Sequence, residues 1–469
     1  MNYDVVIGIE VHAELKTKTK MFSQASSDFN QKSNQGVALT DFGLPGSLPS
    51  VNLKAVELAL RACLALNMEI DPLLQFDRKC YFYPDLPKGY QITQQYFPIG
   101  KKGSLKLKDK VVNITRLHLE EDTARQFHEG DKTLIDFNRS GNPLIEIVSD
   151  PDLSSALEAM EYVDKLRLLL LYAGVSDAKM EEGSLRCDIN VSLKKPGTKE
   201  LGAKVEIKNL NSISNIGRAL EFEIKRQSEL LGLNQEIVEA TMRYDEKSRQ
   251  TVLMRDKDDQ VNYHYIVEGN ILPIKLEAEF LNQIKTNLPT LPEMYYEKLA
   301  SYHVSKKDSE VLINNYDLLS FFLKTTPLTK EPLEVVKWLL SDILGYLNKN
   351  EVKISETKLS AESLVELIDL VNSETISNTQ AKTILPFVMK GQKPSVVISE
   401  QGLSLDSDEA GLLEIINDLI AKHPEAVQDY KNGKDRIVGF LVGKVMQATK
   451  GQANPALTNK LVVSELKKQ

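Results

Sequence analysis

The chain has 469 residues, a length that allows about two to four domains and at least one large core. Apolar residues make up 42% and charged residues 26%, which is ordinary for a globular protein and excludes a disordered or fibrous chain. The net charge of −8 excludes a wholly basic nucleic-acid coat, although an acidic body can still carry a local basic patch.

Nothing in the sequence indicates a membrane or secreted protein. The longest apolar run, residues 168–175, is far shorter than a membrane span. The first residues lack a positive segment followed by an apolar one, so we expect no secretory signal. Cys63, Cys80 and Cys187 lie far apart, which is typical of a reducing compartment and not of a disulfide framework or a four-cysteine zinc site. We therefore expect a cytoplasmic protein that does not bind membranes.

The first predicted element is a strand at residues 5–15, where apolar and polar side chains alternate. Glu10, His12 and Glu14 share one face of this strand, and apolar side chains share the other. A carboxylate and an imidazole two residues apart on one face could converge on a cation. The alternative is the solvated face of an edge strand, and alternation alone leaves both interpretations open.

Residues 77–90 form an aromatic and basic stretch that contains two prolines, which stiffen the chain. Its basic and aromatic members include Lys79, Tyr81, Tyr83 and Lys88. Such a stretch could guide a substrate or line a passage, and it could also be a packed loop.

A second strand is predicted at residues 113–122. Arg116, His118 and Glu120 alternate there with two leucines and Glu121. If the leucines enter the core, Glu121 follows them, and a buried carboxylate needs a metal, a lysine or a strong hydrogen-bond donor. The alternative is that the strand has already ended and the acidic residues form a solvated turn.

Residues 184–193 and 203–208 predict a hairpin with one apolar and one polar face. The polar face carries Ser184, Arg186, Asp188, Asn190 and Ser192 on the first strand and Lys204, Glu206 and Lys208 on the second. This mixture could hold and orient metal-bound phosphates. Cross-strand ion pairs on an open sheet would produce the same pattern without a function.

The character of the chain changes near residue 290. Two prolines in residues 287–292 indicate a linker, because they resist helix continuation, and beyond it apolar residues recur every three or four positions, as in helices. Residues 391–408 are typical of a connector before further short helices. We therefore predict an α+β fold in three units: residues 1–292 form a body with an antiparallel sheet, 293–405 an all-helical middle and 406–469 a small all-helical tail.

Basic residues of the predicted tail could contact the phosphates of a nucleic acid. The candidates are Lys434, Arg436, Lys444 and Lys450. A charged, solvated helix surface would show the same spacing.

Common signatures of nucleotide and hydrolase sites are missing from the sequence. It has no G-x-x-x-x-G-K-[ST] phosphate loop and no G-x-G-x-x-G turn, so any nucleotide must be held by another device. It also lacks H-E-x-x-H, C-x-x-C and G-x-S-x-G motifs.

A series of longer motifs nevertheless runs along the whole chain. In order, they are GIEVHAEL (8–15), DRKCYFYPDLPKGYQITQ (77–94), LHLEED (117–122), DFNRSGNPLIEIVSDPD (136–152), MEEGSLRCDINVSL (180–193), EIKNLNS (206–212) and GFLVGKVMQATKGQANP (439–455). In these motifs the chain closely resembles the B-subunit family of the bacterial-type glutamyl/aspartyl-tRNA amidotransferases.

The resemblance implies a function. Members of this family act with an A subunit, which releases ammonia from glutamine, and with a C subunit. The B subunit uses ATP and Mg²⁺ to phosphorylate the side-chain carboxylate of Glu-tRNA(Gln) or Asp-tRNA(Asn), and channelled ammonia then displaces the phosphate. The resemblance also implies an amino-terminal cradle similar to glutamine synthetase and guanidino kinases, and a YqeY-like tail that binds tRNA.

The resemblance assigns expected roles to residues of the predicted strands and loops. The expected catalytic residues are Glu10, His12, Glu121, Arg186, Asp188, Asn190 and Glu206. The expected metal ligands are Glu10, His12, Glu121 and Glu182, and the expected ATP and phosphate ligands are Arg186, Lys204 and Lys208. The ammonia passage is expected at Lys79, Tyr81, Tyr83, Lys88 and Glu121, and tRNA contacts at Lys434, Arg436, Lys444 and Lys450.

The chain departs from one variant of the family, in which cysteines consistent with zinc occur in the region of residues 22–44. This chain has no cysteine there, so we expect no structural zinc. A noncatalytic tRNA-binding scaffold of the same complex is the main alternative, and a metal-dependent nuclease would use similar carboxylate rows. The sequence does not distinguish Glu-tRNA(Gln) from Asp-tRNA(Asn) as the cellular substrate, nor does it fix the number of metal ions.

Overall fold

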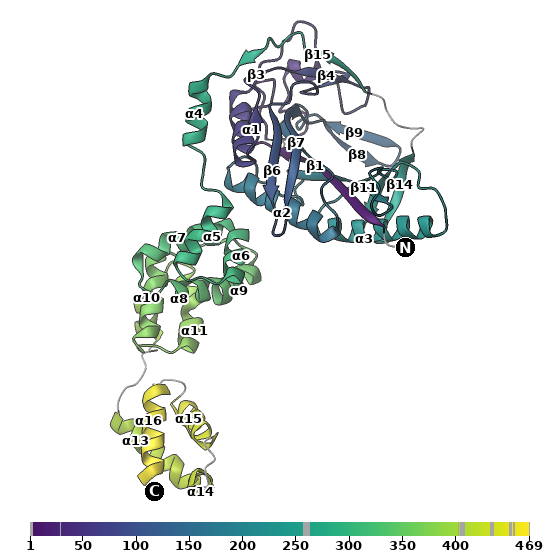
Figure 1. The fold of residues 1–469 in the computed structure, drawn as a ribbon. Helices are drawn as coiled ribbons and strands as arrows, with labels where there is room; N and C mark the ends of the chain where they lie inside the picture. Colours follow the sequence, from purple (N-terminus) through teal and green to yellow (C-terminus); the bar gives the residue numbers. More distant parts are fainter. Residues whose placement is uncertain are drawn as a thin grey trace. The chain divides into compact units, whose positions relative to one another are not determined.

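The computed structural model describes residues 3–28, 30–256, 263–401, 403, 409–431, 436–449, 453 and 455–468. The chain divides into two compact units, Met1–Pro292 and Glu293–Gln469. The first unit contains sheets and helices and the second is helical, which confirms the predicted α+β class (Figure 1).

A nine-stranded sheet forms the centre of the first unit, with the strand order β14-β13-β12-β11-β1-β10-β7-β6-β2. The strands are β1 (Asp4–Glu14), β2 (Glu69–Ile70), β6 (Gly100–Lys106), β7 (Val111–Glu121), β10 (Pro143–Ser149), β11 (Leu185–Lys194), β12 (Val205–Lys208), β13 (Ala240–Asp245) and β14 (Gln250–Asp256). Neighbouring strands are antiparallel, as predicted, except for the parallel pair β12–β13. The first strand of the chain lies between β10 and β11, so segments far apart in the sequence meet at β1.

One face of this sheet is apolar and packs against helices. Along β1, the side chains of Ile7, Ile9, Val11 and Ala13 are fully or almost fully buried, and the polar residues between them face the other side. The covering helices are α1 (Leu53–Ala65), α2 (Ala156–Tyr172) and α3 (Ile213–Gly232), whose apolar residues join the same core (Figure 1). Because the helices cover only the apolar face, the polar residues gather on the opposite face.

Smaller sheets lie around the large one. A three-stranded sheet has the order β15 (His264–Val267), β4 (Asp77–Cys80) and β5 (Tyr90–Thr93). Strands β8 (Arg125–Glu129) and β9 (Lys132–Asp136) form a hairpin, and β16 (Ile274–Lys275) pairs with β3 (Leu73–Leu74). The β5 region is held on β7, because Gln94 Oε1 accepts a hydrogen bond of 3.0 Å from the backbone N–H of Leu119.

The second unit is built from short helices. They are α5 (Pro292–Ser301), α6 (Lys306–Asn314), α7 (Tyr316–Thr325), α8 (Pro332–Trp338), α9 (Leu344–Asn350), α10 (Ala361–Asn372), α11 (Asn378–Val388), α12 (Pro394–Gln401), α13 (Glu409–Lys422), α14 (Pro424–Lys431), α15 (Arg436–Ala448) and α16 (Pro455–Lys468). Ser360 caps α10 by accepting a hydrogen bond from the backbone N–H of Ser363. Helix α4 (Ala278–Thr286) precedes the predicted linker and belongs to the first unit.

Helices α13 to α16 share a hydrophobic core of their own, with Leu412, Ile416, Leu441, Val445 and Val462 buried in it. The predicted boundary between residues 405 and 406 lies outside the described residues, and the division of the helical half into 293–405 and 406–469 stays a prediction. In the described part of the chain, no helix combines the length and the apolar character that a membrane span requires.

Candidate active site

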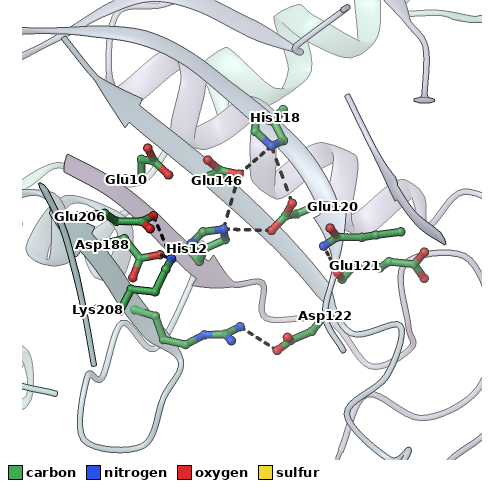
Figure 2. Close-up of polar contacts among 12 residues, drawn as sticks. Glu10, His12, His118, Glu120, Glu121, Asp122, Glu146, Asp188, Glu206 and Lys208 are labelled. Carbon is green, nitrogen blue, oxygen red and sulfur yellow. Dashed lines mark hydrogen bonds and ion pairs between the residues drawn. The ribbon is translucent and has the colours of Figure 1, made fainter. Parts of the chain in front are cut away.

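A row of polar side chains crosses four neighbouring strands on the open face of the large sheet. His118 on β7 lies opposite Glu146 on β10, Glu146 lies opposite His12 on β1, and His12 lies opposite Arg186 on β11. Residues directly opposite each other in antiparallel strands project from the same face, so the register alone brings these side chains together. Figure 2 shows His12, His118, Glu120 and Glu146 pointing toward one another.

The imidazoles and carboxylates of this row are in direct contact. His12 Nε2 lies 3.3 Å from Glu120 Oε1 and 3.5 Å from Glu146 Oε2. His118 Nε2 lies 3.0 Å from Glu146 Oε2 and 3.8 Å from Glu120 Oε2. Glu120 and His118 are buried, so little water separates the charges.

These contacts shift the pKa of every member of the cluster. Burial alone would lower the pKa of the two imidazoles, but the carboxylates of Glu120 and Glu146 override it and raise the pKa of His118 to about 9 and the pKa of His12 well above its usual value. Burial also opposes the charged form of the carboxylates, yet the imidazoles lower the pKa of Glu120 to about 2 and the pKa of Glu146 well below its usual range. The two carboxylates therefore stay ionised and hold positive charge between them, a place that a metal cation could take.

The same residues fit a divalent metal ion. His12, Glu120 and Glu146 each offer one ligand atom, and these atoms lie within 4.8 Å of one another. Two carboxylates and one imidazole suit Mg²⁺ or Mn²⁺, which prefer oxygen ligands and tolerate a nitrogen. Beside them His118 contacts both carboxylates, the position from which a neighbouring group orients metal ligands.

A second polar cluster lies on the adjoining strands β1, β11 and β12. Asn190 Nδ2 donates a hydrogen bond of 2.9 Å to Glu10 Oε1, and burial together with the charge of Glu146 raises the pKa of Glu10. Lys208 forms ion pairs with Asp188 and, at 3.0 Å, with Glu206. This cluster extends the acidic surface away from His12 (Figure 2).

Two further predicted site residues, Arg186 on β11 and Glu121 at the end of β7, have carboxylate or lysine partners of their own. Arg186 Nη2 donates a hydrogen bond of 2.8 Å to Asp122 Oδ2, and this carboxylate raises the pKa of Arg186. Glu121 is buried on the opposite side from Glu120, where it forms an ion pair with Lys88 and accepts a hydrogen bond of 2.8 Å from the backbone N–H of Ile92.

Comparison with known proteins places the chain in a family. The family described as the GatB/GatE catalytic domain matches residues 5–282, and the GatB domain family matches residues 320–466. The chain is 45% identical to the B subunit of the aspartyl/glutamyl-tRNA(Asn/Gln) amidotransferase of Mesoplasma florum, with 98% of each chain covered. It is 44% identical to the protein of the same name from Geobacillus thermodenitrificans, with 100% of each chain covered. The chain belongs to the B-subunit family of the aspartyl/glutamyl-tRNA(Asn/Gln) amidotransferases. The predicted resemblance to this amidotransferase family is thereby confirmed.

Within the catalytic domain of this amidotransferase family, the structure regroups the residues that we predicted as metal ligands. His12 is in the carboxylate cluster, and Glu10 lies two residues before it on the same face of β1. Glu121 faces Lys88 instead, and Glu182 lies in the loop before β11, exposed and paired with Lys179. Both carboxylates lie apart from the His12 cluster, and their roles as metal ligands stay predictions.

Two carboxylates of the cluster, Glu120 and Glu146, are not among the ligands predicted from sequence. Glu120 was visible as a member of an alternating row, but we selected Glu121 instead, because Glu121 follows the leucines toward the core. Glu146 was not selected, although it is a single carboxylate among the apolar residues of Pro143–Ser149. A lone acidic residue in a buried strand is the signal that could have found it, because a buried charge needs a partner.

The predicted ammonia-passage residues gather around the β4 strand and the loop that follows it. Lys79 Nζ lies 4.3 Å from the ring centroid of Tyr263, and Tyr81 packs edge-on against the same ring. Tyr83 is exposed, whereas Lys88 is paired with Glu121. The carboxylate of Glu121 is therefore paired with Lys88, and the ammonia passage stays a prediction.

The predicted tRNA contacts fall on or near α15. Arg436 is exposed at the start of this helix, and Lys444 Nζ lies 5.8 Å from the ring centroid of Phe440. Lys434 and Lys450 lie outside the described residues. Tail binding to tRNA stays a prediction, as does the absence of structural zinc.

Proposed function

We propose that this chain phosphorylates the side-chain carboxylate of glutamate on tRNA(Gln), of aspartate on tRNA(Asn), or of both, and then transfers ammonia to the activated carboxylate. The observation that carries this proposal is the His12–Glu120–Glu146 cluster on the open face of the catalytic domain. The relatives carry the name of a tRNA amidotransferase, and this cluster is suited to metal-assisted phosphoryl chemistry.

His12, Glu120 and Glu146 would hold Mg²⁺, and of these His12 is among the ligands that we predicted from sequence. When bound, the ion would neutralise negative charge between ATP and the incoming carboxylate. His118 would keep the two carboxylates oriented through its contacts with them.

The second cluster would position the reacting groups. Glu10 is held by Asn190 and faces the metal cluster, which suits a contact with a metal-bound water or a second ion. Lys208 forms ion pairs with both Asp188 and Glu206. It would therefore orient these two carboxylates, and it stays a candidate for a phosphate contact. Arg186 and Lys204 stay candidates for phosphate contacts.

Ammonia would come from an A subunit in a complex that also contains a C subunit. The buried Lys88–Glu121 pair, with Lys79, Tyr81 and Tyr83 nearby in the chain, supports an entry route beside β7. Buried charges in such a route let a small polar molecule pass where an apolar wall would not. The described residues of the helical unit, including Arg436 and Lys444, would contact tRNA. We propose that this reaction takes place in the cytoplasm, where aminoacyl-tRNA is used.

The test reconstitutes the chain with its A- and C-type partners and supplies ammonium, Mg²⁺, ATP and glutamate-charged tRNA(Gln), with aspartate-charged tRNA(Asn) as a second substrate. We expect amide formation only with ATP, and at least a hundredfold loss in Glu146→Gln with tRNA affinity retained. Glu229→Gln, a change at an exposed position of α3, is the matched control. Binding of tRNA without any amide product would instead favour a scaffold, and cleavage of RNA without ATP would favour a nuclease.

A further inference from the structure

The cations on the open face of the large sheet fall into two groups. On β11 and β12, two of them are paired with carboxylates: Arg186 is bound by Asp122 at 2.8 Å, and Lys208 by Asp188 and Glu206. A cation that already has a carboxylate partner has less charge to offer an anionic substrate.

Arg116 on β7 belongs to the other group. It lies two residues before His118 on the same strand and so projects from the same face, opposite Val148 on β10. Among the residues that the structure describes, its side chain has no hydrogen-bond or ion-pair partner, and its Nε is buried without an acceptor. A partly buried guanidinium without an anion is costly, which makes the position selective for a negatively charged ligand.

Arg116 also stands beside the carboxylate cluster. Glu146 lies opposite His118 in the sheet, so Arg116 is the diagonal neighbour of Glu146. Diagonal neighbours of this kind lie about 7–8 Å apart along the backbone, within reach of long side chains. Tyr265 lies close enough to these groups for their charges to act on it. Burial raises the pKa of Tyr265, and the charges of Lys79, Glu146 and Arg116 all contribute to the shift. An anion bound by Arg116 would thus lie next to the ion held by His12, Glu120 and Glu146.

Lys79 adds a second positive charge on this side. Its ammonium group lies over the Tyr263 ring and, in the described part of the chain, pairs with no carboxylate. Arg116 and Lys79 therefore bring unpaired positive charge to the β7 and β4 side of the metal cluster, toward the proposed entry of ammonia.

We propose that Arg116 binds the terminal phosphoryl group of ATP, the group that passes to the side-chain carboxylate. This inference rests on the proposed function. In the transfer, a carboxylate oxygen forms a bond to the terminal phosphorus as the bond from that phosphorus to the bridging oxygen breaks, and ADP leaves. Ammonia then forms a bond to the carboxyl carbon and loses a proton, as the bond to the phosphate oxygen breaks and phosphate leaves. Arg116 can hold the phosphoryl group through both steps because its planar fork matches phosphate oxygens.

The test compares binding of ADP with binding of an ATP analogue that has an imido bridge, both with Mg²⁺, to the complex containing Arg116→Gln. A contact with the terminal phosphoryl group predicts that the analogue binds roughly 10- to 100-fold more weakly, whereas ADP affinity stays unchanged. Arg116→Lys should recover part of the lost affinity, since it keeps the charge but not the fork. In the amidation assay, kcat should fall in Arg116→Gln more than the KM for charged tRNA rises.

Arg167→Gln is the matched control, because Arg167 lies on α2 and pairs with Asp164 at 2.8 Å, on the helix side of the sheet. It should leave both affinities unchanged. Equal weakening of ADP and the analogue, or no weakening of either, would overturn the assignment. If the wild-type complex forms no amide with ATP, the proposed function fails instead, and the two binding constants still decide the role of Arg116.

Discussion

Glu120 and Glu121 are adjacent on β7, yet their carboxylates lie in separate sites on opposite sides of the strand. Glu120 contacts His12 and His118 on the open face (Figure 2). Glu121 is paired with Lys88 and accepts a hydrogen bond from the backbone N–H of Ile92 in β5. Successive side chains of a strand point to opposite faces, so one dipeptide can serve two buried sites. In the proposed function, one of them holds the ion and the other meets ammonia.

This separation predicts different consequences for two matched substitutions. Glu120→Gln removes a charged ligand and should weaken Mn²⁺ binding by more than about tenfold, the lower bound for losing even a supporting group. Glu121→Gln should leave Mn²⁺ affinity within about twofold and should lower amide formation with glutamine more than with added ammonium. Mn²⁺ binding followed by electron paramagnetic resonance, together with the two amidation assays, checks both. Equal loss of Mn²⁺ affinity in the two variants would contradict the division.

The sequence pattern predicts which residues face the open side of each strand, and this holds for His12, Asp188 and Asn190. It does not predict which strands are neighbours. β1 lies between β10 and β11, which follow it by more than a hundred residues, so His12 and Glu146 meet only through long-range pairing. Local periodicity carries no information about such pairing, and the long motifs identify the family without stating which side chains touch.

Strand ends limited the prediction as well. Glu120 belongs to the cluster only because β7 continues through Glu121 before the chain turns. The sequence left a solvated turn equally possible there. The pairing of Pro143 and Leu144 with the end of β7 is what keeps these residues in the sheet, and that partner strand comes more than twenty residues later.

The pKa shifts predict how the metal-free protein responds to pH. His118 has a pKa of about 9 in the folded chain and an ordinary value of about 6.5 when unfolded, so the folded state binds its proton more tightly. The resulting stability is fully present below about pH 6.5 and is lost as the pH rises through about 9. In EDTA, His118→Gln should therefore lower the free energy of unfolding by on the order of 2 kcal/mol at pH 6 and by much less above pH 9.

Urea unfolding in EDTA at both pH values measures this difference. His128→Gln is the control, because His128 is exposed on β8 and contacts Thr133, so its effect should be small at either pH. A loss of stability in His118→Gln that is the same at both pH values would mean that the imidazole contributes packing and not charge.

The packing of the sheet on α1 gives a prediction away from the active site. A methyl group added at Gly100 on β6 would lie 2.5 Å from Cys63 Sγ, closer than such atoms approach in proteins, and 3.0 Å from Met68 Sδ, which is tighter than most such contacts. Cys63 is fully buried in α1, so its short side chain has little room to move. Gly100→Ala should therefore destabilise the protein by about 1–3 kcal/mol, the usual cost of overpacking a core.

Removing the opposing sulfur should relieve this strain. In Gly100→Ala combined with Cys63→Ala, the loss in free energy of unfolding should be smaller than the sum of the two single losses, because the new methyl group takes part of the space left by the sulfur. Gly232→Ala at the end of α3 is the control, since an added methyl group there meets nothing within 4 Å. If urea unfolding shows that the two losses in free energy simply add in the double variant, the Sγ atom of Cys63 is not the group that clashes with the added methyl group.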